Sequence, residues 1–218
     1  MKAVIFDLDG TLVDSMWLWE SLADNYLLSI GIEPPKDLGE ILKELTLKEA
    51  AFYMKERFNI ESTPHEINED MGNLLADYYA NRLQLKPYVL EVLKEFKNRN
   101  IIMVIATATD EHLVEAVLNR HDIGGYFEFI QTCNNIGLSK GQPEFFQIII
   151  DRLKLDPKEM WVFEDALYCM VSAKKAGLNI VAVEDKSSLS DLEKIKKISD
   201  MYIENFSQLE VGRLWKNY

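Results

Sequence analysis

Two aspartates one residue apart follow a short apolar run, residues 3–6, near the start of the chain. Alternate residues of a strand point to the same side, so Asp7 and Asp9 are expected to converge on one small volume. Two such charges would repel by about 4 kcal/mol at an effective dielectric of about 20 unless a cation or a shared proton lies between them. The glycine that follows, Gly10, lets a backbone amide approach a ligand closely. The segment predicts a phosphate or metal site, with an ordinary acidic turn as the alternative.

The composition is that of a folded globular protein with an acidic balance. Hydrophobic residues make up 48% and charged residues 28% of the 218 residues, which argues against disorder. The formal net charge of −12 argues against a general surface for nucleic acid or anionic membranes. An anionic substrate would therefore have to be attracted by a local site.

The cysteines and the N-terminus bear on the compartment. Two cysteines, Cys133 and Cys169, are too few for a disulfide framework, and no basic region with a long apolar segment opens the chain. The most apolar stretches have the length of strands and fall short of the ~20 residues that span a membrane. We expect a cytoplasmic protein without a membrane helix.

Short apolar runs alternate with helix-periodic segments over most of the chain. The expected strands cover residues 2–6, 101–106, 128–132, 161–163, 180–183 and, more weakly, 201–203. The expected helices between them include residues 88–97, 111–120, 143–153 and 167–176. This alternation predicts an α/β fold with a Rossmann-like parallel sheet and helices on both faces. The charged stretch at residues 186–197 is interpreted as the solvated face of a helix.

The gap between the first two strands has no convincing strand of its own. Two capping-box patterns lie in it, Thr46 with Glu49 and Thr63 with Glu66, and together they favour a bundle of helices. The expected domains are an α/β core, residues 1–14 and 85–218, and an inserted helical domain, residues 15–84.

Polar side chains follow several of the expected strands, where ligands collect in an open α/β sheet. They are Asp7 and Asp9 after the first strand, Thr107, Ala108 and Thr109 after the second, Ser139 and Lys140 after the third, and Glu164 and Asp165 after the fourth. Carboxylate oxygens suit a hard cation, and Mg²⁺ is favoured because it keeps waters and accepts phosphate oxygens. A phosphoryl group held by that cation, Lys140 and Thr107 would be neutralised while a carboxylate attacks in line.

The same residues, in the same order, resemble the four motifs of the haloacid dehalogenase superfamily of phosphohydrolases. The motifs are Asp7-Leu8-Asp9-Gly10-Thr11, Thr107 after a hydrophobic strand, Lys140 before Pro143-Glu144-Phe145, and Glu164-Asp165 after another hydrophobic strand. The helical insertion after the first motif is similar to the small helical cap of the subgroup that contains β-phosphoglucomutase and phosphoglycolate phosphatase. The resemblance covers essentially the whole chain.

The resemblance implies a role for each motif residue. Asp7 would be the nucleophile that forms an aspartyl-phosphate, and Asp9 the general acid and base. Thr107, the adjacent Ala108 and Lys140 would bind the transferring phosphoryl group. The Mg²⁺ ligands would be Asp7, Asp9 through its backbone carbonyl, Asp165 and, directly or through water, Glu164. The implied partner is a small phosphorylated metabolite rather than nucleic acid or membrane, and we expect a monomer or a weak dimer.

Two other functions stay open at this level. A mutase of the same subgroup must hold a second phosphate, and the position of one mutase lysine is occupied here by Asp110. A carboxylate there favours a phosphomonoester hydrolase, although Lys43, Lys48 or Arg82 could supply a cation instead. The other alternative is a regulatory protein that binds phosphate without turnover. The presence of every motif acid argues against this alternative.

Overall fold

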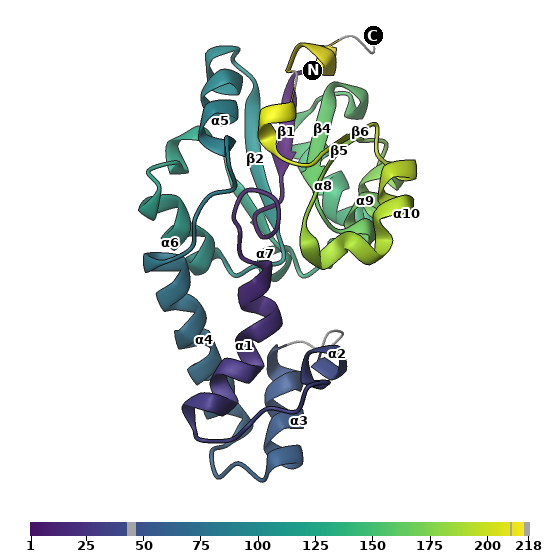
Figure 1. Cartoon of the computed structure of the whole chain (residues 1–218). Helices are drawn as coiled ribbons and strands as arrows, with labels where there is room; N and C mark the ends of the chain where they lie inside the picture. Colours follow the sequence, from purple (N-terminus) through teal and green to yellow (C-terminus); the bar gives the residue numbers. More distant parts are fainter. Residues whose placement is uncertain (43–46, 210, 216–218) are drawn as a thin grey trace. The chain divides into compact units, whose positions relative to one another are not determined.

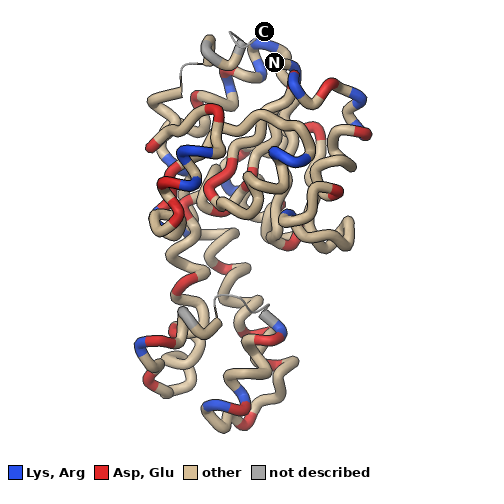
Figure 2. Tube along the Cα trace, turned by 90° about the vertical axis from the view of Figure 1, so that its right-hand side faces the viewer, with Lys and Arg blue, Asp and Glu red and all other residues tan. Residues whose placement is uncertain are grey.

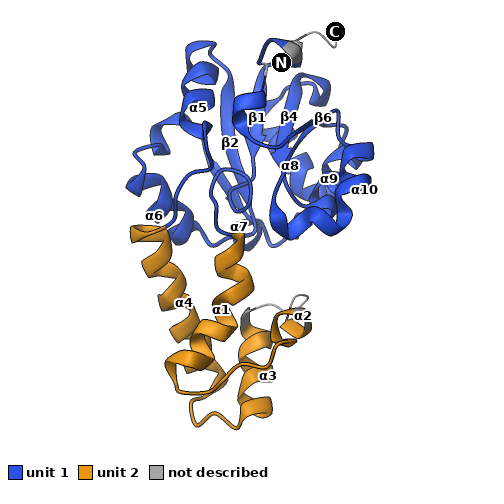
Figure 3. Ribbon diagram, in the orientation of Figure 1, with its two compact units in different colours: residues 1–15, 83–218 blue, residues 16–82 orange. Residues whose placement is uncertain are grey.

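The structure, a computed structural model, describes residues 1–42, 47–209 and 211–215. Its contacts divide the chain into two compact units: unit 1 comprises residues 1–15 and 83–218, and unit 2 comprises residues 16–82 (Figure 3). The junctions fall within two residues of the boundaries expected from the sequence.

Unit 1 is built on a six-stranded sheet in the order β3-β2-β1-β4-β5-β6 (Figure 1). The strands are β1 (Ala3–Phe6), β2 (Ile102–Thr107), β3 (Ile130–Thr132), β4 (Met160–Glu164), β5 (Asn179–Val183) and β6 (Met201–Ile203). Every neighbouring pair is parallel. The predicted α/β parallel sheet is therefore confirmed, and each strand begins within two residues of its expected start.

Helices alternate with these strands, as the periodicity predicts. The α-helices of unit 1 are α5 (Val89–Asn98), α6 (Glu111–Arg120), α7 (Cys133–Ile136), α8 (Pro143–Leu153), α9 (Leu167–Lys175) and α10 (Leu192–Ile198). Short 3₁₀ helices are η1 (Gly124–Tyr126), η2 (Pro157–Glu159), η3 (Lys186–Asp191), η4 (Phe206–Gln208) and η5 (Val211–Trp215). The charged stretch expected to form one solvated helix is thus split between η3 and α10.

Both faces of the sheet are covered, because its strands are apolar on both sides. On one face, alternate strand residues such as Ile5 and Val162 pack with Phe145, Ile149 and other residues of α8, α9 and α10. On the other face the rings of Phe6, Phe96 and Phe163 lie within 6.1 Å of one another, centroid to centroid. The strands are thereby held rigidly, which fixes the residues at their ends.

The turn after β1 is a tight hydrogen-bonded loop. The amides of Leu12 and Val13 both donate to the carbonyl of Leu8 at 2.9 Å, and the amide of Gly10 donates to Val13. Gly10 has a φ of 79°, a backbone conformation that is unfavourable for residues with a side chain. This loop turns the chain back at the sheet edge and holds both aspartates of the first motif there.

Unit 2 is helical, with α1 (Met16–Ser29), α2 (Leu38–Leu42), α3 (Leu47–Phe58) and α4 (Pro64–Asn81). The capping box predicted at Thr63 and Glu66 is confirmed: Glu66 N donates to Thr63 Oγ1 at 3.2 Å, and Thr63 N donates to Glu66 Oε2 at 2.7 Å. The other predicted capping box begins at Thr46, which lies outside the described residues. Buried side chains such as Leu22 and Met71 form the interior of this unit.

Acidic and basic residues are interspersed along the trace of each unit (Figure 2). Among the helices that the structure describes, none combines the length and the apolar character needed to cross a bilayer.

The aromatic cluster generates a test of the fold. Phe96 of α5 is fully buried against Phe6 and Phe163, so Phe96→Ala should lower the free energy of unfolding by about 3–5 kcal/mol. Ile148 of α8 is 36% exposed, and Ile148→Ala should cost about 1 kcal/mol or less. Urea denaturation followed by circular dichroism measures both. Equal losses in the two variants would contradict the assignment of this core.

Candidate active site

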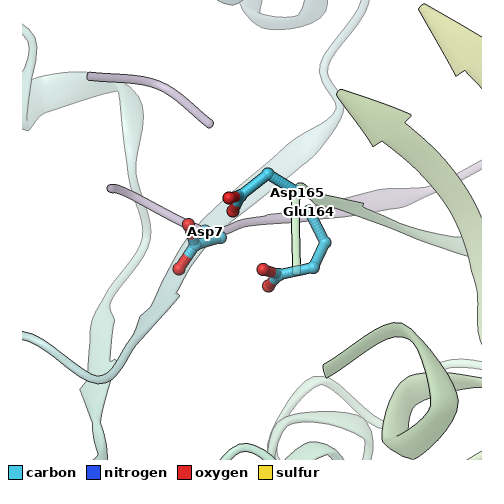
Figure 4. A group of neighbouring side chains, drawn as sticks. All are labelled: Asp7, Glu164 and Asp165. Carbon is cyan, nitrogen blue, oxygen red and sulfur yellow. The ribbon is translucent and has the colours of Figure 1, made fainter. Parts of the chain in front are cut away.

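Three carboxylates meet at the carboxyl end of the sheet. Asp7 directly follows β1, Glu164 ends β4, and Asp165 follows it, and β1 and β4 are adjacent strands. One oxygen from each of these three side chains lies within 4.8 Å of the others, and the three carboxylates face a common space (Figure 4). All three side chains are buried, with exposed fractions of 1–6%. The sheet thus brings together acids that lie more than 150 residues apart in the sequence.

Lys140 neutralises part of this cluster. Its Nζ donates to Asp7 Oδ1 and to Glu164 Oε2, both at 2.6 Å, and the lysine is only 2% exposed. A tight turn holds the residue, since Ser139 N donates to the side chain of Gln142 and Gly141 N donates to Ser139 Oγ. The bond from Lys140 Nζ to Glu164 reaches the end of β4 and the bond to Asp7 reaches the end of β1, so one ammonium group links the ends of two neighbouring strands.

Burial and mutual repulsion shift the ionisation of these groups. Burial, reinforced by Glu164, raises the pKa of Asp7 to about 8, although Lys140 opposes the shift. Burial and the charges of Glu164 and Asp7 raise the pKa of Asp165 well above its usual value. Burial alone would lower the pKa of Lys140, but the two acids raise it well above 10.5. One positive charge against three carboxylates leaves a deficit that protons fill unless another cation is bound.

Asp9 lies outside this three-carboxylate group and has partners of its own. Ser15 Oγ donates to Asp9 Oδ1 at 2.6 Å, and Thr109 Oγ1 donates to Asp9 Oδ2 at 2.5 Å. The two hydroxyls come from the loop after β1 and from the segment after β2. They fix the orientation of a carboxylate that the sequence places beside Asp7.

The expected phosphate-binding residues stand at the end of β2. Thr107 is the last residue of that strand and is 1% exposed, and its Oγ1 accepts a bond from Thr109 N at 3.1 Å. Ala108 follows the strand and is exposed. Since β2 neighbours β1, both residues lie one strand away from Asp7.

Some polar contacts of the site were not anticipated from the sequence. Ser188 Oγ reaches Asp165 Oδ2 at 3.4 Å, and Thr11 Oγ1 reaches Asp165 Oδ1 at 3.5 Å. Ser188 lies in η3, within the stretch that we expected to be a solvated helix face. One signal was available: Asp185 and the serines after it follow β5 at the same edge of the sheet.

The donor set suits a divalent metal ion. The three clustered side chains offer oxygen ligands alone, which hard cations prefer. Ligand oxygens around an octahedral Mg²⁺, at about 2.1 Å from the ion, lie about 3–4 Å apart, and one oxygen of each of these carboxylates already lies within 4.8 Å of the others. After Lys140 is counted, the cluster carries two uncompensated negative charges if all three acids are ionised. A dication would balance them.

Comparison with known proteins identifies the family. The model of the haloacid dehalogenase-like hydrolases matches residues 4–183, and the chain belongs to this family. The match spans the region that contains all four sequence motifs, so the predicted superfamily and the prediction of an enzyme are confirmed.

Among known relatives, the chain is 26% identical over 178 residues to a phosphorylated carbohydrates phosphatase of Thermotoga maritima, with 82% of each chain covered. It is 24% identical over 195 residues to hexitol phosphatase B of Escherichia coli, covering 87% of this chain and 86% of that protein. Both relatives are named as phosphatases.

The fold also recurs among solved structures. A crystal structure from Thermotoga maritima, provisionally assigned as a β-phosphoglucomutase, superimposes with a TM-score of 0.80. The match covers 93% of this chain and 94% of the other at 24% sequence identity. This likeness supports the α/β fold described above.

The raised pKa of Asp7 gives the metal-free protein a testable dependence on pH. In the unfolded chain Asp7 ionises near 3.8, whereas in the folded protein it keeps its proton up to about 8. The stabilisation that depends on protonated Asp7 is fully present below the pKa of the unfolded state, and it is lost as the pH rises through the pKa of the folded state. The gain in Tm caused by Asp7→Asn should therefore grow from about pH 5 to about pH 8 in EDTA.

Thermal unfolding of both proteins across this range measures the effect. The matched control is Asp122→Asn, at an exposed position where φ is 53°, a conformation that asparagine also tolerates. Its difference from the wild type should stay constant. If the difference in Tm between Asp7→Asn and the wild type is also constant across this pH range, the surroundings do not raise the pKa of Asp7.

Proposed function

We propose that the protein is a magnesium-dependent phosphatase that hydrolyses a small phosphomonoester through an aspartyl-phosphate on Asp7. The observation that carries this proposal is the contact of Lys140 with both Asp7 and Glu164, beside Asp165. Burying a lysine and two acids costs free energy of desolvation, and Lys140 is only 2% exposed. Such a costly arrangement favours a functional role for the lysine. Here it would lie beside both the attacking carboxylate and the incoming phosphate.

In the first step an oxygen of Asp7 attacks the phosphorus atom in line with the ester bond. The bond from phosphorus to the leaving oxygen breaks, and Asp9 gives a proton to that oxygen, which departs as an alcohol. Lys140 and the hydroxyl of Thr107, with the backbone amide of Ala108, would hold the phosphoryl oxygens. These donors stand in fixed positions, so they stabilise the charge that develops without reorganising.

In the second step a water molecule attacks the phosphorus atom of the aspartyl-phosphate. Asp9, now ionised, takes the proton of that water, and the bond to Asp7 breaks to release inorganic phosphate. Asp9 needs a defined orientation for both transfers. The donors Ser15 Oγ and Thr109 Oγ1, one at each carboxylate oxygen, supply it in this structure.

The metal ligands would be Asp7, the backbone carbonyl of Asp9, Asp165 and, directly or through water, Glu164. When bound, the Mg²⁺ ion supplies positive charge that keeps the acids ionised and offsets the charge of the phosphoryl group. The buried, oxygen-only donor set supports this assignment.

We assign the substrate to sugar phosphates or similar small metabolites. Support comes from the two phosphatase relatives, whose names specify phosphorylated carbohydrates and hexitols. Unit 2 would serve as a cap that moves on its two connections and excludes water during transfer. Those connections run side by side within unit 1, where Val13 and Leu85 form an antiparallel bridge. Substrate selection would then depend on the residues of unit 2.

A β-phosphoglucomutase type of activity is the second candidate, favoured by the structural likeness to a protein provisionally assigned that activity. The charges argue against it. Asp110, where mutases of this group carry a lysine, occupies the N-cap position of α6, and its side chain accepts a bond from Asn134. Arg82 is paired with Asp77 at 2.8 Å, and Lys43 lies outside the described residues. Conversion of β-glucose 1-phosphate to the 6-phosphate would establish the mutase and exclude the proposal.

The nucleophile is tested by replacing Asp7 with its amide. Asp7→Asn keeps the size of the side chain but removes the attacking oxygen anion, so phosphate release from p-nitrophenyl phosphate should fall by about 10³-fold or more. The control Asp122→Asn should keep the wild-type rate. If Asp7→Asn turns over at the wild-type rate, the assignment of the nucleophile is wrong.

The metal requirement is tested by removal and return of the ion. EDTA should abolish phosphate release, and Mg²⁺ should restore it, whereas Ca²⁺ should restore less because it prefers more ligands at about 2.3–2.6 Å. Asp165→Asn should raise the Mg²⁺ concentration for half-maximal activity by about 10-fold or more. Full activity of the wild type in EDTA, after dialysis against the chelator, contradicts the proposal.

A further inference from the structure

Lys86 makes a nearly buried ion pair that the catalytic scheme does not use. Its Nζ lies 2.8 Å from Asp185 Oδ2 and donates to the carbonyl oxygen of Glu184, also at 2.8 Å. The two paired side chains are 12% and 7% exposed. Burial alone would raise the pKa of Asp185, but the hydrogen bond and charge of Lys86 hold that pKa below its usual value. Because the pair is largely withdrawn from water, removing one partner would leave the other buried without compensation.

The ion pair joins two segments that are far apart in the sequence. Lys86 lies just after the return of the chain into unit 1, and its backbone amide donates to the carbonyl of Leu12 at 2.9 Å. Leu12 belongs to the loop that holds Asp9. Asp185 lies in the loop after β5, about one hundred residues further along the chain. Lys86 thus holds the loop after β1 and the loop after β5 together.

From Asp185 the contacts lead to the metal cluster. Asp185 Oδ1 accepts bonds from Ser187 N at 3.0 Å and Ser187 Oγ at 2.7 Å, and the carbonyl of Asp185 accepts Ser188 N at 3.1 Å. These bonds form the turn that places Ser188 Oγ 3.4 Å from Asp165 Oδ2. A small cavity of about 10 Å³, close to the least volume that holds one water molecule, is lined by Asp165, Asp185 and Ser188 among others.

We propose that Lys86 is a positioning residue for the metal site, and that it acts through Asp185 and the Ser188 turn on the orientation of Asp165. The inference rests on the proposed function, since it assumes that Asp165 is a metal ligand. Among the residues that the structure describes, the side-chain hydrogen bonds to the Asp165 carboxylate are the long ones from Ser188 and Thr11, which limit its rotation and leave lone pairs available for a metal ion. Hydrogen-bond partners that orient a metal ligand affect metal affinity, and their loss commonly lowers it by about 10–100-fold.

An electrostatic account and a positioning account make opposite predictions for one variant. If only charge mattered, Lys86→Met would remove a positive charge near the site and tighten cation binding, whereas Asp185→Asn would weaken it. If Lys86 positions Asp165, both changes release the same turn, and both should weaken cation binding. Lys86→Arg keeps the charge and the donors, so it should restore most of the affinity.

The experiment measures the binding of Mn²⁺ alone to the metal-free protein, from the electron paramagnetic resonance signal of free Mn²⁺. We expect Lys86→Met and Asp185→Asn each to raise the Kd about 10-fold, the double variant to add little, and Lys86→Arg to stay within about 2-fold of the wild type. At saturating Mg²⁺ the kcat of Lys86→Met should return to near the wild-type value. If Lys86→Met does not fold, Lys86→Gln, which loses the charge but keeps a donor, takes its place.

The matched control is Lys2→Met, which removes an ion pair with Glu159 at 2.9 Å, on a lysine whose side chain is 58% exposed. Its Kd should equal that of the wild type. An unchanged or lower Kd in Lys86→Met, with the wild type binding Mn²⁺ and Asp165→Asn binding it weakly, overturns the inference and leaves the proposed function standing. Equal Mn²⁺ binding by the wild type and Asp165→Asn overturns the metal site itself, and the inference with it.

Discussion

The contact of one ammonium group with two carboxylates governs the chemistry of this protein. Lys140 lies between Asp7 and Glu164 in a region that water hardly reaches, so each of the three charges depends on the others. Because Asp165 is close by, one lysine does not neutralise the cluster. Without a metal ion, protons on the carboxylates would balance the remaining negative charge. A divalent cation would balance the same charge and leave the carboxylates ionised.

The sheet topology makes this crowding possible. Since β1 and β4 are adjacent and parallel, Asp7 and the pair Glu164 and Asp165 leave the sheet at the same edge. Lys140 comes from outside the sheet, on a turn before α8. Packing on both faces of the sheet fixes the strand ends, so the acids cannot move apart to relieve their repulsion. The excess of negative charge at this edge follows from the fold rather than from any one side chain.

Much of this was predictable from the sequence, because it depends on local pattern. Apolar runs located every strand, and polar residues directly after them located Asp7, Thr107, Glu164 and Asp165. The contacts of Asp9 with Ser15 and Thr109, and of Lys86 with Asp185, were not predictable in this way. They join residues up to about one hundred positions apart, and their distances depend on register and loop shape. Ser188 lies in a charged stretch that resembles a solvated helix, and its contact with Asp165 depends on the shape of the loop after β5.

The central claim is that Asp7 carries the phosphoryl group while Lys140 and a metal ion balance the charge. The most direct test is to quench the enzyme in acid during turnover, reduce it with borohydride and locate the product by mass spectrometry. Reduction converts an aspartyl-phosphate to homoserine, and the account predicts homoserine at position 7 when substrate and Mg²⁺ are both present. Homoserine at another aspartate, or its absence at every time point while phosphate is released, would contradict the account.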